Sequence, residues 1–177
     1  MSDATDAILQ DAHGRSVLRF ERLLRHPPEK VWKALTELDE LRAWHPSPFE
    51  LEPVLGGVLR YLPPDGDAFG DGEVTEYHPP RVLAYTWGED QLRWELEPRE
   101  EGCLLVLTHV FDDRFKAARD AAGWHLCLDA LSSSLDGAPS RPKGDDEGVP
   151  PGWRELNRAY EEQFGIPSDE ATPPPAR

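Results

Sequence analysis

Between residues 49 and 111 the chain is a succession of short apolar segments, each followed by turn-forming residues. Connections this short join strands that pair as neighbours, so the pattern predicts an antiparallel meander. The breaks all supply turn chemistry and fall at Gly56-Gly57, "PPDGD", "HPP", "GED" and "REEG". The strands are expected near 49–54, 56–62, 69–77, 81–88, 91–98 and 102–111.

Alternation in the last three strands predicts a sheet with one buried face. In "LRWELE" every second residue is apolar and the residues between are charged, which is typical of a strand with one face in water. The inward parity of the three strands collects large apolar and aromatic side chains: Leu83, Tyr85, Trp87, Leu92, Trp94, Leu96, Leu105, Leu107, His109 and Phe111.

Helical spacing replaces alternation on both sides of the meander. Residues 16–25 alternate as one more strand, and "HPPEKVWKALTE" and "ELRAW" after it favour two short helices. The longest helical stretch is 114–136, in which Trp124, Leu128 and Leu131 recur at helical intervals before Gly137 ends it. Such an amphipathic helix needs an apolar surface, and the aromatic face of the sheet provides one.

Composition divides the chain into one domain and its flanks. The 38% of hydrophobic residues suffices for a single core, which we expect over residues 15–137, behind a flexible N-terminal segment at 1–14. Residues 138–152 have the composition of a Pro/Gly-rich linker. In 153–177 we expect a short helix that docks on another part of the chain, followed by a disordered tail.

The charge excludes several classes of partner. A formal net charge of -15 at pH 7 repels nucleic acid and anionic membrane surfaces. No apolar run approaches the roughly 20 residues of a membrane span, and the first fourteen residues do not resemble a signal peptide, so a cytoplasmic location is expected. Two cysteines are too few for a disulfide framework, and neither the histidines nor the aspartates follow a metal-binding pattern. We expect no metal and no cofactor.

The order of elements resembles the START-like (Bet v 1-like, SRPBCC) superfamily, and within it the bacterial proteins similar to the C-terminal domain of the activator of the heat-shock-protein-90 ATPase. The resemblance covers about residues 16–137 and is carried by "HPPEKVWKALT", Trp44, Gly56-Gly57, "GEVTEYHPPRVLAYTW", "LTH" and "GWHLCLDALSSSLDG". It implies an α+β helix-grip fold: a curved antiparallel sheet of about seven strands around a long C-terminal helix, with two short helices after the first strand.

The resemblance also implies a cavity between sheet and helix that often takes a hydrophobic or amphipathic ligand, but it implies no single reaction. The first hypothesis is therefore binding of a small hydrophobic ligand, such as a lipid, without established catalysis. The alternatives are a polyketide cyclase/aromatase-like or hydrolase-like enzyme that uses a cavity histidine, and a co-chaperone or regulatory interaction module. Both a monomer and a homodimer are compatible with the sequence.

The expected cavity lining combines aromatic and aliphatic side chains with two histidines. Either histidine is a candidate for proton transfer, although His109 is better explained as a satisfied interior histidine, and His125 is explained equally well as a helix-surface one. The lining residues are Trp44, Tyr61, Phe69, Tyr85, Trp87, Trp94, Leu96, Leu107, His109, Trp124, His125 and Leu128.

Arg22 shares the inward parity of Leu18 and Phe20 in the first strand. A guanidinium placed there needs an acidic partner. We expect Glu73, Glu76 or a ligand carboxylate to supply it.

Overall fold

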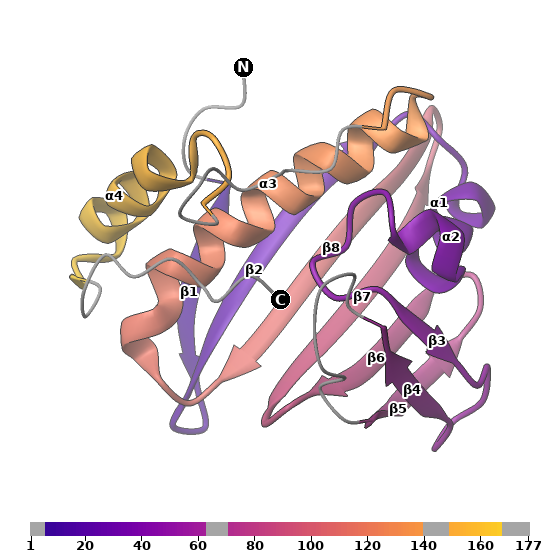
Figure 1. Ribbon diagram of the computed structural model, residues 1–177, viewed down its shortest axis with the longest axis horizontal. Helices are drawn as coiled ribbons and strands as arrows, with labels where there is room; N and C mark the ends of the chain where they lie inside the picture. Colours follow the sequence, from indigo (N-terminus) through magenta and orange to yellow (C-terminus); the bar gives the residue numbers. More distant parts are fainter. Residues whose placement is uncertain (1–5, 63–70, 140–148, 168–177) are drawn as a thin grey trace.

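The computed structural model describes residues 6–62, 71–139 and 149–167. Its centre is a sheet of eight antiparallel strands in the order β1-β2-β8-β7-β6-β5-β4-β3, with the long helix α3 across one face (Figure 1). The elements are β1 (Ala7–Ala12), β2 (Arg15–Leu24), α1 (Pro28–Thr36), α2 (Leu38–Leu41), β3 (Phe49–Leu51), β4 (Val58–Tyr61), β5 (Asp71–His78), β6 (Val82–Trp87), β7 (Asp90–Arg99), β8 (Gly102–Phe111), the 3-10 helix η1 (Arg114–Lys116), α3 (Ala117–Leu135) and α4 (Trp153–Phe164).

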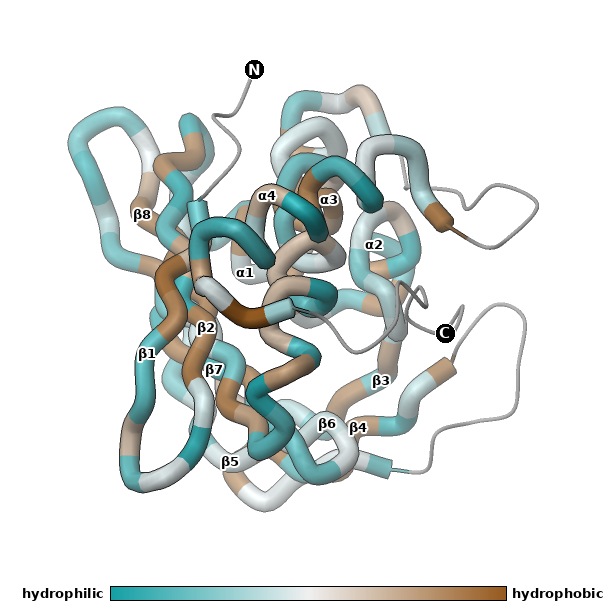
Figure 2. Tube along the Cα trace, turned by 90° about the vertical axis from the view of Figure 1, so that its left-hand side faces the viewer, coloured by the Kyte–Doolittle hydropathy of each residue, from teal (hydrophilic) through white to brown (hydrophobic). Residues whose placement is uncertain are grey.

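The predicted α+β helix-grip fold is confirmed. Strands β3 to β8 form the expected meander, and β2 returns to pair with β8 along its whole length. The predicted parity also holds, because the inward side chains of β7 and β8 are buried while charged residues line the other face of β7. Hydrophobic and hydrophilic residues alternate along the strands in Figure 2.

Within the N-terminal segment expected to be flexible at 1–14, Ala7–Ala12 instead form strand β1, while residues 1–5 lie outside the described ranges. Ala7–Ala12 pair with the first half of β2 through a two-residue turn at His13 and Gly14. Both turn residues have positive φ, 53° and 80°, which is the backbone of a type I′ hairpin whose twist suits two antiparallel strands. The strand is hard to recognise in the sequence because only Ala7 of its residues is fully buried.

Helix α3 is buried on two sides. One side packs on the sheet, and helix α4 covers part of the other, as Figure 1 shows. Alanines and His125 are therefore buried together with the predicted stripe of Trp124, Leu128, Leu131 and Leu135. The docking helix predicted in the C-terminal region is α4, while most of the expected linker and the last ten residues lie outside the described ranges.

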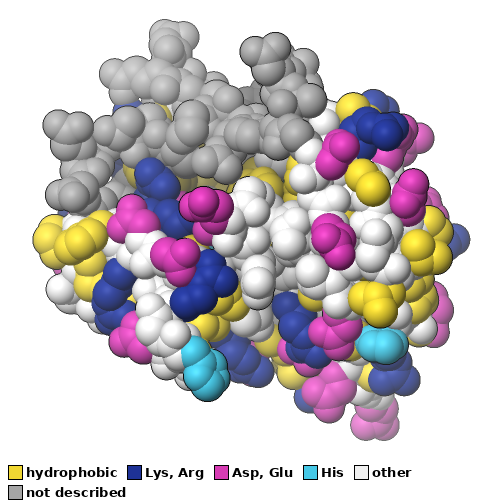
Figure 3. Space-filling view, turned by 90° about the horizontal axis from the view of Figure 1, so that it is seen from below, with side chains coloured by type: hydrophobic (Ala, Val, Ile, Leu, Met, Phe, Trp, Pro, Cys, Tyr) yellow, Lys and Arg dark blue, Asp and Glu magenta, His cyan; other side chains and the backbone are white. Residues whose placement is uncertain are grey.

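The short helices α1 and α2 follow β2 as predicted and cover the sheet at the end away from α4 (Figure 1). Trp44, just after α2, donates its indole N–H to the Ala34 carbonyl of α1 at 2.9 Å. None of the described helices is both long enough and apolar enough to cross a membrane. On the face seen in Figure 3, acidic and basic side chains are interspersed.

We predict that Leu128→Ala lowers the free energy of unfolding by about 2–5 kcal/mol, because it leaves a cavity where α3 meets the sheet. Leu128 is 1% exposed. Urea denaturation measures the change. The matched substitution Leu55→Ala, at a leucine that is 72% exposed, should change stability by no more than about 0.5 kcal/mol. Equal losses in the two variants would contradict the packing described for α3.

Candidate functional site

A cluster of aromatic rings lies between α3, the inner face of the sheet and the segment after α2. Trp124 of α3 is near its centre, with ring centroids 5.5 Å from Trp87, 5.7 Å from Trp94 and 5.8 Å from His45. Contacts of this kind, mostly edge to face, are the favoured geometry of aromatic pairs. We call this group the aromatic cluster; its members are Trp44, His45, Phe49, Tyr61, Tyr85, Trp87, Trp94 and Trp124.

Most of the predicted lining residues come together here. Trp44, Tyr61, Tyr85, Trp87, Trp94 and Trp124 belong to the aromatic cluster, and Leu96, Leu107 and Leu128 are buried in the same core. His109 adjoins the cluster, with its ring 6.2 Å from that of Trp124. His125 does not join it but faces α4, and Phe69 lies outside the described residues.

The hydroxyl of Tyr85 is the polar centre of the aromatic cluster. The Ser47 backbone N–H donates to His45 Nδ1 at 3.0 Å, so the proton of the neutral His45 ring is on Nε2. This N–H faces the Tyr85 oxygen at 3.2 Å, and the Trp94 indole N–H donates to the same oxygen at 3.0 Å. Burial raises the pKa of Tyr85 well above 10, so its oxygen stays protonated.

Ser47 adds a second buried hydroxyl beside His45. Its side chain is inaccessible to solvent, and its Oγ has no hydrogen-bond partner among the described residues. Buried polar groups almost always have partners, because an unpaired one costs about 1–3 kcal/mol. His45 and Ser47 were not predicted; they lie in "WHPSPF", which follows neither the helical nor the strand period.

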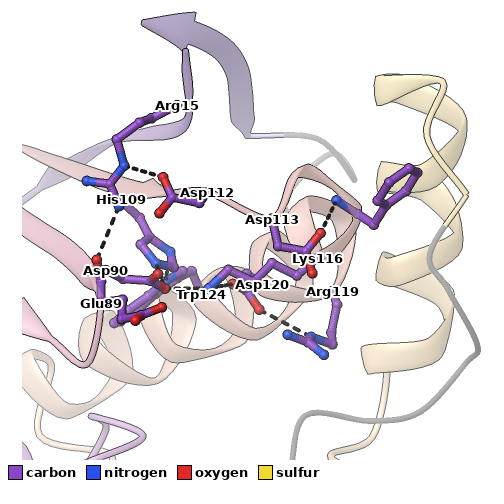
Figure 4. A network of polar contacts seen from close by, with 11 residues as sticks. Arg15, Glu89, Asp90, His109, Asp112, Asp113, Lys116, Arg119, Asp120 and Trp124 are labelled. Carbon is purple, nitrogen blue, oxygen red and sulfur yellow. Dashed lines mark hydrogen bonds and ion pairs between the residues drawn. The ribbon is translucent and has the colours of Figure 1, made fainter. Parts of the chain in front are cut away.

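His109 links α3 to the sheet through a chain of hydrogen bonds, shown in Figure 4. The Trp124 indole N–H donates to His109 Nδ1 at 3.1 Å, so the neutral ring carries its proton on Nε2 and donates it to Asp90 at 2.8 Å. The Lys116 ammonium lies 2.5 Å from the same carboxylate. Burial favours a higher pKa for Asp90, but the hydrogen bonds from His109 and Lys116 outweigh it and lower the pKa.

This network already contains its own cation. The ligand atoms of Asp90, His109 and Asp120 lie within 4.8 Å of one another, as the donors of a metal site would. Lys116, however, contacts both carboxylates, at 2.5 Å from Asp90 and 3.7 Å from Asp120. Its ammonium provides the positive charge that two adjacent carboxylates need, and a metal ion would have to displace it. The geometry therefore favours an ion-paired network over a metal centre.

His125 joins α3 to α4 and to the start of β1. Its Nδ1 is 2.9 Å from the Tyr160 hydroxyl, which also accepts the Asp6 backbone N–H at 3.2 Å. Arg22 lies nearby and pairs with Asp6 at 2.6 Å and with Asp129 at 2.7 Å. We expected Glu73, Glu76 or a ligand carboxylate to pair with Arg22. The expectation is wrong for Glu73 and Glu76, because Asp6 and Asp129 pair with Arg22 instead.

The reason for this correction is the added strand β1. The chain just before it brings Asp6 beside Arg22, whereas Glu76 on β5 pairs with Arg93 of β7 at 2.8 Å. These ion pairs depend on which distant segments of the chain lie side by side. The alternation of side chains within one strand does not show which segments these are.

The comparisons with known proteins agree with this fold. The family model described as "Activator of Hsp90 ATPase homolog 1-like protein" matches residues 25–136. A conserved protein of unknown function from Enterococcus faecalis, EF2215, superposes with a TM-score of 0.73 at 24% identity, covering 93% of this chain and 93% of that chain. No curated protein matches the chain.

Two further solved structures, CalU16 and DynU16, are similar to this chain. CalU16 from Micromonospora echinospora has a TM-score of 0.67 at 19% identity, over 92% of this chain and 97% of its own. DynU16, a protein in the dynemicin biosynthetic locus, has a TM-score of 0.62 at 27% identity, over 71% of this chain and 49% of its own. The similarity to DynU16 thus covers about half of that protein.

We predict that the coupling between Asp90 and Lys116 is about 1–3 kcal/mol in a double-mutant cycle built from Asp90→Asn and Lys116→Met. Their side chains are only 15% and 19% exposed, so water screens the pair weakly. The control cycle uses the exposed pair Asp39 and Arg42, with Asn and Met, and should give less than about 0.5 kcal/mol. The coupling energies are measured by urea denaturation. Equal coupling in both cycles would contradict the conclusion that the buried Asp90–Lys116 pair stabilises the link between α3 and the sheet.

We also predict that His125 makes stability depend on pH. Burial lowers its pKa, so the unfolded chain, in which histidine titrates near about 6.5, binds this proton more tightly than the folded protein. Its contribution is complete above about pH 6.5 and is lost as the pH falls through the lowered folded pKa. Denaturation at several values between about pH 7 and about pH 5 should show a flatter decline for His125→Asn than for the natural protein.

The control for this pH series is His13→Asn, at the exposed β1–β2 turn, where asparagine tolerates the positive φ. This variant should decline with falling pH as steeply as the natural protein. An unchanged decline in His125→Asn would show that the α3–α4 contact does not respond to this proton.

Proposed function

The chain belongs to the family of Activator of Hsp90 ATPase homolog 1-like proteins, and from this membership we propose that it binds a small amphipathic ligand between helix α3 and the inner face of the sheet. The observation that carries the proposal is a buried aromatic cluster whose Tyr85 hydroxyl has an unused donor, together with the buried Ser47 hydroxyl that has no described partner. Ligand sites typically combine aromatic walls with a few polar groups of this kind.

Trp87 indicates where a ligand would enter. It is the only member of the aromatic cluster that is not buried, and its ring contacts both Trp124 and His45. A flat or aliphatic molecule that inserts beside Trp87 would gain contact with the inner rings and replace partly exposed apolar surface. The occurrence of DynU16 in a biosynthetic locus is compatible with a small-molecule ligand for this fold.

Binding is favoured over proton transfer by the surroundings of His109. A histidine that acts as a general base needs one ring nitrogen within reach of the substrate. In the described structure one nitrogen of His109 accepts from Trp124 and the other faces Asp90. Both positions are thus occupied by groups that fix the ring, and this supports a structural part for His109 within a binding protein.

We expect a thermal-shift screen of fatty acids, sterols and aromatic polyketides to find ligands chiefly among the neutral compounds, with native mass spectrometry to detect bound molecules. Trp87→Ala should weaken binding of a hit by about tenfold or more, because the proposed entrance loses its aromatic wall. Trp32→Ala is the matched control, since Trp32 is also half-buried but packs against Tyr77. Unchanged affinity in Trp87→Ala, or equal losses in both variants, would contradict the proposed site.

A further inference from the structure

We propose that Tyr85 and Ser47 select ligands that present a neutral carbonyl oxygen, such as a ketone, ester or quinone, with Tyr85 as the specificity-determining hydrogen-bond donor. This inference rests on the proposed function and specifies the chemistry of its ligand. It comes from the hydrogen-bond inventory of the aromatic cluster.

The Tyr85 hydroxyl has its acceptor capacity filled and its donor unused. A phenol oxygen accepts through its lone pairs and donates one proton. His45 Nε2 and Trp94 Nε1 both bring an N–H to this oxygen, at 3.2 Å and 3.0 Å. His45 cannot accept the phenol proton in its neutral form, because its other nitrogen already accepts from the Ser47 backbone N–H. The Tyr85 proton therefore has no acceptor among the described residues.

The two N–H groups also make Tyr85 a better donor. Hydrogen bonds in a chain polarise one another, so an oxygen that accepts two N–H groups donates its own proton more strongly. The raised pKa of Tyr85, which burial causes, keeps the proton on the oxygen at any physiological pH. What the site lacks is an acceptor, and a ligand oxygen would supply it.

Ser47 strengthens the same conclusion. Its Oγ is buried without a described partner, and its backbone N–H is the group that orients His45 toward Tyr85. A carbonyl oxygen has two lone pairs and could accept from two hydroxyls, whereas an ether or an alkene would satisfy them less well or not at all. One short segment thus fixes the direction of the Tyr85 donor through His45 and carries a second buried hydroxyl without a described partner.

The charge of the aromatic cluster selects a neutral acceptor over an anion. Among the described residues no lysine or arginine hydrogen-bonds to the Tyr85 or Ser47 hydroxyl, and His45 Nδ1 accepts the Ser47 N–H and so carries no proton of its own. A buried carboxylate without a cation is strongly disfavoured, whereas a neutral carbonyl loses little on leaving water once it is hydrogen-bonded. We therefore expect ketones to bind more tightly than carboxylates of the same shape.

The test uses three naphthalenes of similar shape, measured by isothermal titration calorimetry. They are 2-acetylnaphthalene, which has a carbonyl; 2-isopropenylnaphthalene, in which a methylene group replaces the oxygen; and 2-naphthoate, which is an anion. The natural protein should bind the ketone about tenfold more tightly than the alkene, as one net hydrogen bond predicts, and more tightly than the carboxylate.

Tyr85→Phe should remove the preference for the ketone, so that the variant binds the ketone and the alkene with similar affinity; measurable alkene binding shows that the altered site still accepts a ligand. Tyr160→Phe, which removes another buried hydroxyl that holds α4, should keep the preference. Equal affinity of the natural protein for ketone and alkene, or a preference that survives in Tyr85→Phe, would overturn the inference and leave the proposed function standing. No binding of any of the three would count against both.

Discussion

The indole N–H of Trp124 fixes helix α3 to the sheet, and the arrangement of the interior depends on this bond. His109 can accept it only because the other ring nitrogen donates to Asp90, and Asp90 is in turn held by Lys116. Two strands, η1 and α3 thus share one continuous set of hydrogen bonds. Since the same indole ring contacts Trp87, Trp94 and His45, the bond also places the centre of the aromatic cluster. Removing it would leave α3 held to the sheet by the Arg22–Asp129 ion pair and by nondirectional packing.

Periodicity explains how much of the fold could be predicted. The two-residue period of β7 and β8 assigned Trp94, Leu107 and His109 to the inner face, and the structure buries all three. These signals are local, because each residue's direction follows from its own strand. Strand β1 was missed because its alternation is weak and its identity depends on pairing with β2 through the His13–Gly14 turn. Hairpin formation of this kind is visible in the sequence only when both strands have a clear pattern.

The hydrogen-bond partners of the buried side chains were harder to predict than the face of the sheet toward which each side chain points. The sequence indicated that His109 points inward, yet Asp90, the first residue of β7, lay in the predicted "GED" turn, where no pattern marked it as the partner of His109. His45 and Ser47 were missed for a related reason, since both occupy an irregular segment in which no period reports burial. His125 was predicted to line the cavity because the surface on which α4 docks cannot be known from the apolar spacing of α4 itself. Whether the predicted residues bind a ligand stays a prediction.

The pairing of β2 with β8 also bears on how the chain reaches this structure. Leu24 is opposite Cys103 and Ser16 is opposite Phe111, so the central part of the sheet joins segments from opposite ends of the domain. On a growing chain the meander from β3 onward can form by local steps, whereas β2 has to wait for the last strand. Contacts of such long sequence separation slow folding, because the intervening loop must be closed before they stabilise anything. The early helices and the first hairpin thus remain without their final neighbours until nearly the whole domain has been synthesised.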